Sequence, residues 1–264
     1  MSLRINTNVE AFNAHRNLVH TSSMVARSME RLSSGFRINR AADDAAGLAI
    51  SEKLRGQIGG LDQAGRNVQD GISLVQTAEG SLTEVHSMLQ RVRELAVQYQ
   101  NGTLSTSDRS AINSEVSQLT QEIERIGTTA QFNNIHLLDS AQSISFQVGA
   151  NDREVISVST VSLGSAVGTI DITSSTVLAD VDRAIDSVSQ QRATFGAVQN
   201  RLEHTYNNLT TYQENLTASE SRIRDVDMAS EMVNFTKNNI LVQAGTAMLA
   251  QAQQAPQQVL SLLR

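Results

Sequence analysis

The chain has 264 residues, enough for one or two domains, and is 40% apolar but only 3% aromatic. It has no cysteine, which excludes disulfides and thiolate metal sites, and no apolar run approaches the roughly 18 residues of a membrane helix. Its net charge of −6 is concentrated in an acidic middle, which argues against nucleic-acid binding over most of the chain. We therefore expect neither nucleic acid nor membrane as a partner.

The N-terminal region carries a thin apolar stripe. Apolar residues recur every seven positions, at Ala11, Leu18, Val25 and Leu32, which predicts a helix. Such a narrow stripe buries little surface by itself, so we expect this end of the chain to need a partner.

Two adjacent acids, Asp43 and Asp44, follow in the stretch AADDAAGLAI, residues 41–50. Paired carboxylates can bind a metal or perform acid–base chemistry, but the sequence has no HExxH motif and its five histidines are dispersed. A carboxylate before a helix-favouring run can instead accept hydrogen bonds from free backbone N–H groups. We predict that Asp43 and Asp44 are helix caps, and we expect no catalytic, metal or cofactor site.

The longest regular pattern is a heptad repeat over residues 61–99. Two apolar series, three residues apart, form it: Leu61, Val68, Val75, Leu82, Leu89 and Ala96, and Ala64, Gly71, Ala78, Val85, Val92 and Tyr99. The pattern predicts a coiled-coil-like helix that stops near Asn101-Gly102. A second helix is predicted to begin at a capping box of Ser105 and Asp108 and to end at Gly127.

The rhythm then changes to alternation. Apolar and polar residues alternate on both sides of the turn Gly149-Ala150-Asn151-Asp152, which predicts a β-hairpin at about residues 141–161. Residues 160–177 are rich in Ser, Thr and Gly and are predicted to be an exposed loop or short strands.

A second long heptad series follows, at Val181, Val188, Phe195, Leu202, Leu209, Leu216 and Ile223, with partial support from Ala184, Val198, Tyr212 and Val226. Two long helices with matching seams should pack in one bundle. The predicted fold is therefore mainly α, a long antiparallel coiled-coil-like helix bundle with a small β-hairpin. A last stripe, Met248, Ala252, Ala255, Val259 and Leu262, predicts a C-terminal helix that also needs a partner, and other copies of the chain could supply it.

Several long motifs resemble those of bacterial flagellin. They are ERLSSGFRINRAADDAAGLAISEKLRGQI, LQRVRELAVQ, QFNNIHLLD, FQVGAND and MLAQAQQAPQQVLSLLR, together with the opening RINTNVEAFNAHRNL. The resemblance covers about residues 1–160 and 178–264, so that 160–177 stands where most flagellins carry outer domains. It implies an inner domain D0 made of residues 1–42 and 225–264, and a domain D1 made of residues 43–224.

The resemblance also implies a function and partners. The chain would be a structural subunit that polymerises into the flagellar filament, outside the cell, after export without a cleaved signal peptide. Its partners would be other subunits, the export apparatus, a chaperone, the cap protein, hook–filament junction proteins and host innate receptors. A hook–filament junction protein is the alternative from the same class. An enzyme or a free coiled-coil module are alternatives from other classes, although the chain lacks the variable region and the metalloprotease motif that some flagellins carry.

Two sets of site residues follow from the resemblance. Positions that match flagellin contacts with a Toll-like receptor are Gln90, Arg91, Leu95, Ile112 and Glu115; the same face could serve filament contacts instead. In flagellins the C-terminal helix lines the central channel, which makes Gln253, Gln254 and Gln257 candidate channel-lining residues. These glutamines could alternatively bind neighbouring subunits.

Overall fold

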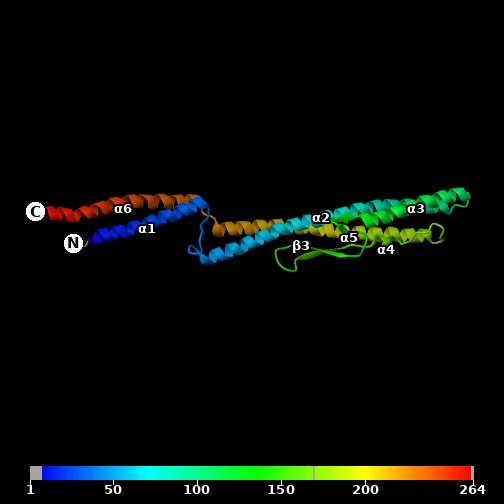
Figure 1. Ribbon diagram of the computed structural model, residues 1–264, viewed down its shortest axis with the longest axis horizontal. Coiled ribbons are helices and arrows are strands. Elements are labelled where there is room, and N and C mark those ends of the chain that lie inside the picture. Colours follow the sequence, from blue (N-terminus) through cyan, green and yellow to red (C-terminus); the bar gives the residue numbers. More distant parts are fainter. Residues whose placement is uncertain (1–7, 169, 263–264) are drawn as a thin grey trace. The chain divides into compact units, whose positions relative to one another are not determined.

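The computed structural model describes residues 8–168 and 170–262, and for residues 255–262 it describes the backbone alone. Long helices dominate this part of the chain (Figure 1). The helices are α1 (Val9–Ser34), α2 (Ala45–Tyr99), α3 (Thr106–Thr129), α4 (Leu163–Val167), α5 (Val177–Arg224) and α6 (Met228–Leu262). The strands are β1 (Gln131–Phe132), β2 (Ile135–His136), β3 (Ser143–Gln147) and β4 (Val155–Ser159).

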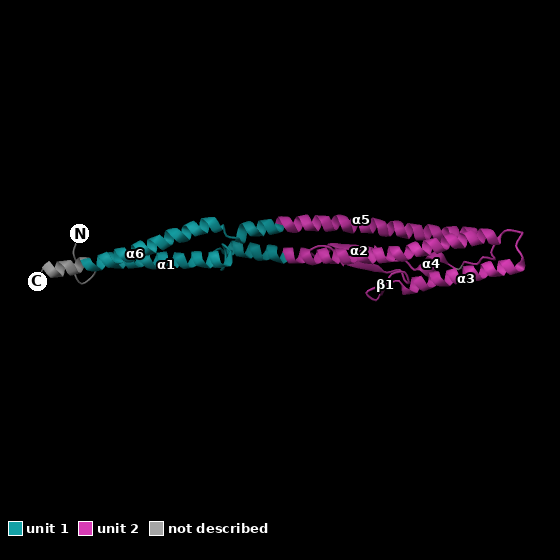
Figure 2. Ribbon diagram, turned by 90° about the horizontal axis from the view of Figure 1, so that it is seen from above, with its two compact units in different colours: residues 1–56, 216–264 teal, residues 57–215 magenta. Residues whose placement is uncertain are grey.

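The chain forms two compact units, coloured separately in Figure 2. The terminal unit consists of residues 1–56 and 216–264, and the central unit consists of residues 57–215. The division falls inside α2 and α5, so each of these helices contributes to both units.

The central unit is a helix bundle built on the two heptad seams. All six residues of the first α2 series are buried, as are Val181, Val188, Phe195, Leu202 and Leu209 of α5. Salt bridges across the bundle join Arg93 of α2 to Asp182 of α5, at 2.6 Å, and Arg91 of α2 to Glu115 of α3, at 2.9 Å. These long packed helices confirm the predicted mainly α fold. Burying each Leu or Val of the seam contributes roughly 1.5–3 kcal/mol, which is why these faces of the helices pack together.

Two supporting positions of the α5 seam were predicted wrongly. Val226 lies beyond Arg224, where α5 ends. Tyr212, the proposed partner position in the α5 series, is 46% exposed. The α5 seam is fully buried only as far as Leu209; Leu216 and Ile223 continue the heptad but are half-buried.

Helix α3 begins as predicted and ends later. The backbone N–H of Asp108 donates to Ser105 Oγ at 3.2 Å, and the N–H of Ser105 donates to Asp108 Oδ2 at 3.0 Å, so the capping box is confirmed. Gly127, however, does not end the helix, which continues to Thr129. Gly127 is buried, and a Cβ there would lie 3.4 Å from the side chain of Leu163, so this glycine provides space for α4 to pack.

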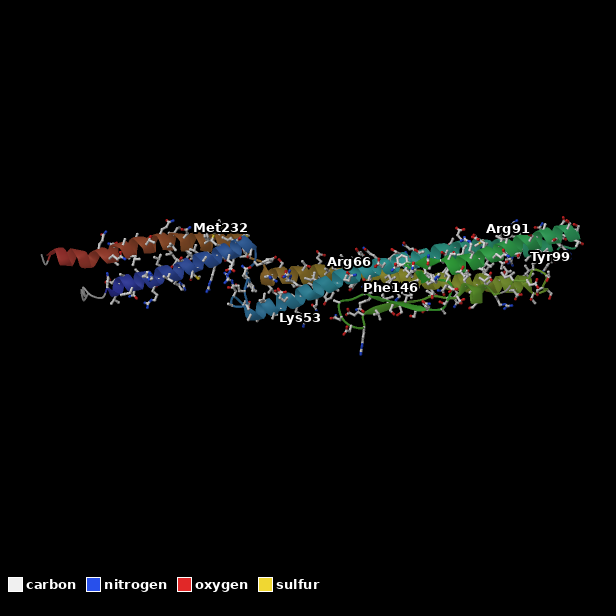
Figure 3. The ribbon with its side chains drawn as sticks, viewed as in Figure 1. Lys53, Arg66, Arg91, Tyr99, Phe146 and Met232 are labelled. Carbon is white, nitrogen blue, oxygen red and sulfur yellow. The ribbon has the colours of Figure 1, made fainter. Side chains whose placement is uncertain are left out.

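The predicted hairpin is confirmed as the antiparallel pair β3–β4. Its register pairs Ser143 with Ser159 and Phe146 with Ile156, which places the apolar residues of both strands on one face. That face lies against the bundle, because a Cβ on Gly71 of α2 would lie 3.4 Å from the ring of Phe146 and 3.3 Å from Leu202 (Figure 3). Asn67 fixes the hairpin further by donating from Nδ2 to the carbonyl of Gln147 at 3.0 Å.

A second, smaller hairpin was not predicted. Strands β1 and β2 pair across Asn133 and Asn134, whose φ angles are 48° and 63°. Asparagine tolerates this left-handed conformation better than most residues, so the Asn-Asn pair between apolar residues was the available signal.

Residues 160–177 are not an exposed loop or a pair of strands. Leu163 and Val167 of α4 are buried, and so are Ile170 and Ile172 beyond it. The sequence did not predict that this segment is packed, because its few apolar residues lie among many small polar ones.

Candidate functional site

The terminal unit contains the paired helices α1 and α6, which run antiparallel and side by side (Figure 1). Asn8 caps α1 by accepting from the backbone N–H of Ala11 at 3.0 Å, and its Nδ2 donates to the carbonyl of Ala252 on α6 at 2.7 Å. At the opposite end of the pair, Arg31 Nη1 lies 3.7 Å from the buried carboxylate of Glu231. These contacts set the register between the two helices.

The inner stripe of α1 is the one that the sequence predicts, and that of α6 agrees with the prediction only in part. Ala11, Leu18, Val25 and Leu32 are all half-buried. On α6 the half-buried side includes Phe235, Val242 and Leu249, with Asn238, Gly245 and Ala252 three places on. Of the predicted stripe, Ala252 is half-buried, whereas Met248 is 62% exposed and Leu249 takes its place; Ala255, Val259 and Leu262 lie among residues whose side chains are not described.

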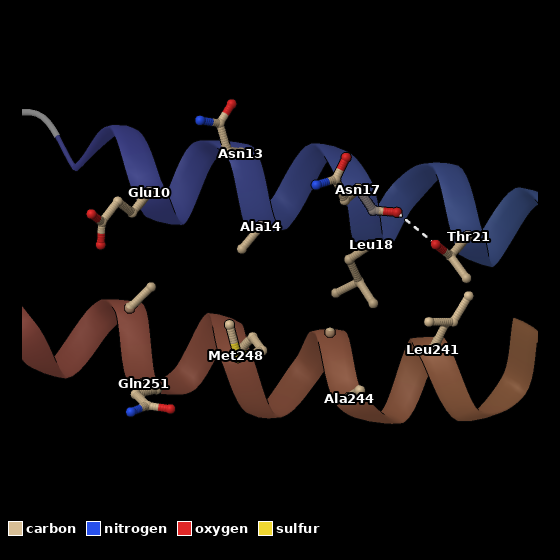
Figure 4. Close-up of a pocket in the computed structure, with 12 residues that line it drawn as sticks. Glu10, Asn13, Ala14, Asn17, Leu18, Thr21, Leu241, Ala244, Met248 and Gln251 are labelled. Carbon is tan, nitrogen blue, oxygen red and sulfur yellow. Dashed lines mark hydrogen bonds between the residues drawn. The ribbon is translucent and has the colours of Figure 1, made fainter.

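A groove of about 740 Å³ separates α1 and α6 along part of their length. Leu18 of α1 and Leu241 of α6 project into the space between the helices (Figure 4). Leu18 also lies close to Gly245, where an added Cβ would be 3.3 Å from Leu18 Cδ1. The two helices therefore meet closely at small residues and leave the rest of the inner stripe partly open.

The terminal unit has almost no buried apolar core. Among the described residues, Ile38 is its single buried apolar residue, whereas the central unit contains every other one. Thirteen of the seventeen exposed large apolar side chains of the described residues belong to the terminal unit, and Phe12 and Val233 are the most exposed of them. Large apolar side chains exposed in this number within one unit are typical of a protein–protein interface.

The two segments that connect the helices are held together by backbone hydrogen bonds. Arg37 N–H donates to the carbonyl of Arg224 at 2.6 Å, and Val226 N–H donates to that of Gly35 at 3.0 Å. Gly35 has a φ of 75°, a left-handed conformation that ends α1 and that other residues rarely adopt.

Arg224 joins these segments to α2. Its guanidinium lies 4.8 Å from the centre of the Phe36 ring, and its Nη1 lies 2.7 Å from Glu52 Oε1. The sequence patterns gave no signal for this arrangement, because Arg224 is 172 or more residues away from each of its two partners.

Asp43 and Asp44 have different partners. Asp44 Oδ1 accepts from the N–H of Gly47 at 2.8 Å at the start of α2, in the geometry of a helix cap. The Asp43 carboxylate instead turns back on the loop and accepts from the N–H groups of Arg40 and Asn39, at 3.1 and 3.3 Å. The hydrogen bond from Arg40 is the main reason why the pKa of Asp43 lies below its ordinary value.

A further cap at the start of α6 was missed. Asp227 Oδ1 accepts from the N–H groups of Ala229 and Ser230, at 3.0 and 3.2 Å. An acid directly before a helical run was the sequence signal for it.

The candidate receptor residues occupy the face where α2 meets α3. Arg91 forms ion pairs with Glu115 and, at 3.2 Å, with Glu94. The hydrogen bonds to these two carboxylates raise the pKa of Arg91, and the one to Glu115 has the larger effect. Gln90 is exposed on α2 next to Arg91, which is labelled in Figure 3. Leu95 and Ile112 are only 2% and 7% exposed, so the surface that a partner could reach here belongs mainly to the three polar residues.

The candidate channel-lining glutamines lie on α6. The side chains of Gln253 and Gln254 are exposed. Gln257 belongs to the part of α6 whose side chains are not described.

No group of three or more His, Asp or Glu side chains among the described residues is arranged to hold a metal ion. No helix in the described ranges combines the length and the hydropathy needed to cross a membrane.

The chain is similar to known proteins of one family. The model of the bacterial flagellin N-terminal helical region matches residues 5–143, and that of the C-terminal helical region matches residues 178–263. A flagellin of Halalkalibacterium halodurans is 56% identical over 98% of this chain and 99% of its own length. A flagellin of Bacillus subtilis is 51% identical over 99% of this chain and 100% of its own length.

A solved structure agrees. The crystal structure of Bacillus cereus flagellin, 30% identical, covers 59% of this chain and 94% of that chain, with a TM-score of 0.51. The fold and these relatives define a structural subunit of a filament, and nothing among them favours the hook–filament junction protein. The chain belongs to the bacterial flagellin family.

Proposed function

We propose that the chain acts as a flagellar filament subunit by completing the missing core of its terminal unit with the terminal units of neighbouring copies. The observation that carries the proposal is the concentration of exposed large apolar side chains on α1 and α6 and in the segments beside them. A surface that has no core of its own gains most from burial in an assembly. Head-to-tail contacts that do not close then produce an open helical polymer.

The experiment compares two substitutions of the same kind in the two units. Val233 is 68% exposed on α6, and Val155 is 48% exposed on the hairpin of the central unit. Burying a valine fully is worth roughly 1.5 kcal/mol or more, so Val233→Ser should raise the critical concentration for seeded polymerisation by about tenfold. Val155→Ser serves as the matched control and should change it much less. Circular dichroism of both variants checks that the helices persist, and equal effects of the two changes would refute the proposal.

The division of the chain is part of this proposal. Residues 1–42 and 225–264 would form the inner domain D0, and residues 43–224 the domain D1, with 160–177 in place of outer domains. The depletion of buried apolar residues in the terminal unit supports a D0 that depends on its neighbours.

Several partners belong to the proposal as well. Flagellins form an extracellular filament, and this chain would reach it by export without a cleaved signal peptide, through the flagellar export apparatus and with a chaperone. It would contact the cap protein and hook–filament junction proteins in the growing structure. Gln90, Arg91 and Glu115 would offer a polar surface to a host innate receptor, and Gln253, Gln254 and Gln257 would line the channel. As a structural protein it would have no catalytic activity.

A further inference from the structure

Sulfur is distributed unevenly over the two units. The chain has seven methionines and no cysteine, so thioethers are its only sulfur groups. Six of the methionines belong to the terminal unit, and the five of them among the described residues are 39–62% exposed: Met24, Met29, Met228, Met232 and Met248. Among the described residues the central unit has one methionine, Met88, which is half-buried.

These methionines are part of the apolar surface that we assign to assembly. Met228 and Met232 are four residues apart and therefore share one face of α6. The contact between Arg31 and Glu231 brings the end of α1 beside the start of α6, so Met29 lies at the same end of the helix pair. Met248 borders the groove between the helices (Figure 4).

We propose that these five methionines are a reversible oxidation site for peroxides, through which the redox state of the surroundings controls polymerisation. The thioether sulfur of each methionine attacks one oxygen of hydrogen peroxide and breaks the O–O bond. The sulfur is oxidised by two electrons to a sulfoxide, and the peroxide is reduced to one molecule of water. A thiol-dependent reductase that acts on methionine sulfoxide reverses the change: two thiols supply two electrons and two protons and become a disulfide, and the sulfoxide oxygen leaves as water.

The effect on assembly follows from polarity. A thioether is apolar and adapts its shape to a neighbouring surface, whereas a sulfoxide is a polar, chiral group that must find a hydrogen-bond donor when it is buried. Burying a sulfoxide without a donor opposes association. The inference rests on the proposed function, because it requires these side chains to become buried between subunits.

The same geometry implies that assembly protects the site. The five side chains are accessible in the separate chain but would be covered in the polymer. Peroxide should therefore modify free subunits far more than assembled ones, while half-buried Met88 should react to a lesser and similar extent in both states.

The test begins with the wild-type chain. Purified subunits are treated with hydrogen peroxide, catalase removes the excess, and mass spectrometry locates the sulfoxides. Seeded polymerisation is then measured before oxidation, after it, and after treatment with methionine sulfoxide reductase and a thiol reductant. We expect oxidation of the terminal unit to raise the critical concentration by about tenfold or more, equivalent to about 1.4 kcal/mol per subunit, and the reductase to restore it.

Variants separate the site from general damage. A chain with all five residues changed from Met to Leu keeps apolar side chains of similar volume that peroxide does not oxidise, so its polymerisation should resist peroxide. Met88→Leu is the matched control and should remain as sensitive as the wild type. If the fivefold variant does not polymerise, reversal by the reductase in the wild type decides the question.

The outcomes are distinguishable from those of the proposed function. If untreated wild-type chains do not polymerise, the proposed function fails. If they polymerise and fully oxidised chains do so at the same critical concentration, the proposed function stands and the oxidation site is refuted. Equal modification of free and assembled chains at the five residues would also refute it.

Discussion

Replacing Gly71 with alanine tests how closely the hairpin packs on the long helix of the central unit. Gly71 occupies a seam position of α2, and an added Cβ would lie 3.3 Å from Leu202 Cδ1 and 3.4 Å from two ring carbons of Phe146. The contact with Leu202 is tight for carbon atoms, so Leu202 must move by a few tenths of an ångström, and the two contacts with Phe146 leave no spare room on the other side. Gly80, also within α2, has open space where its Cβ would be.

The two glycines differ in packing but share the same gain in helix propensity. Alanine is more favourable than glycine inside a helix by about 1 kcal/mol, so Gly80→Ala should stabilise the fold by about that amount. Forcing an extra methyl group into a packed core typically costs about 1–3 kcal/mol. Gly71→Ala should therefore be neutral or destabilising by up to about 2 kcal/mol, and at least about 1 kcal/mol worse than Gly80→Ala.

Urea unfolding of the unpolymerised full-length chain, followed by circular dichroism, measures both variants under the same conditions. Because α2 is common to both, the difference between their free energies of unfolding cancels the propensity term and leaves the packing term. If Gly71→Ala stabilised the chain as much as Gly80→Ala does, Phe146 and Leu202 could not lie against Gly71 as described.

Four further predictions concern single residues. Asp44→Ala should destabilise the start of α2 by about 1 kcal/mol while Asp44→Ser should retain most of the cap, as urea unfolding would reveal, and equal losses would exclude capping. Hydrogen bonds from Ser105 lower the pKa of Asp108 in the folded chain below its ordinary value of 3.8. The stabilisation that they give is therefore complete above pH 3.8 and is lost as the pH falls through the folded-state pKa. Asp108→Asn should accordingly be less stable than the wild type at pH 7, and the two free energies of unfolding should converge in strong acid. Arg91→Ala should weaken signalling by soluble subunits in a receptor reporter assay without unfolding the bundle, and unchanged signalling would show that the receptor does not use this residue. Gln254→Glu and Gln254→Lys should polymerise normally when purified yet give shorter filaments on cells; normal growth of both would reject the channel role, and failed polymerisation of the purified variants would favour a subunit contact.

The sequence predicted the central unit well because its helices are packed on one another within the chain. The heptads at Val68 and Leu202, for example, mark residues that are fully buried, and the period of the pattern identifies the buried face. The alternation around Phe146 likewise predicted the hairpin. Small residues were harder to interpret, since Gly127 suggested a helix end but instead provides space for Leu163.

The terminal unit was harder to predict for a physical reason. Its helices have apolar residues on more than one face, so Met248 and Leu249 were equally plausible members of the inner stripe. Contacts with the partner helix determine which of the two residues faces inward, and the repeat pattern of a single helix does not show those contacts. Contacts between distant segments, such as that of Arg224 with Phe36, are equally invisible to patterns within a single helix.

The contrast between the units has a thermodynamic consequence for a polymer subunit. The central unit buries its apolar residues within one chain, so its stability does not depend on concentration. The terminal unit buries one apolar residue and leaves thirteen large ones exposed among those described, so most of the free energy available to it comes from binding other copies. Binding stabilises a folded state in proportion to the logarithm of the partner concentration, and folding of α1 and α6 should therefore be coupled to polymerisation. Because a free subunit gains little by ordering these helices, the chain can remain unassembled in dilute solution and still form a stable filament on a seed that presents the complementary surface.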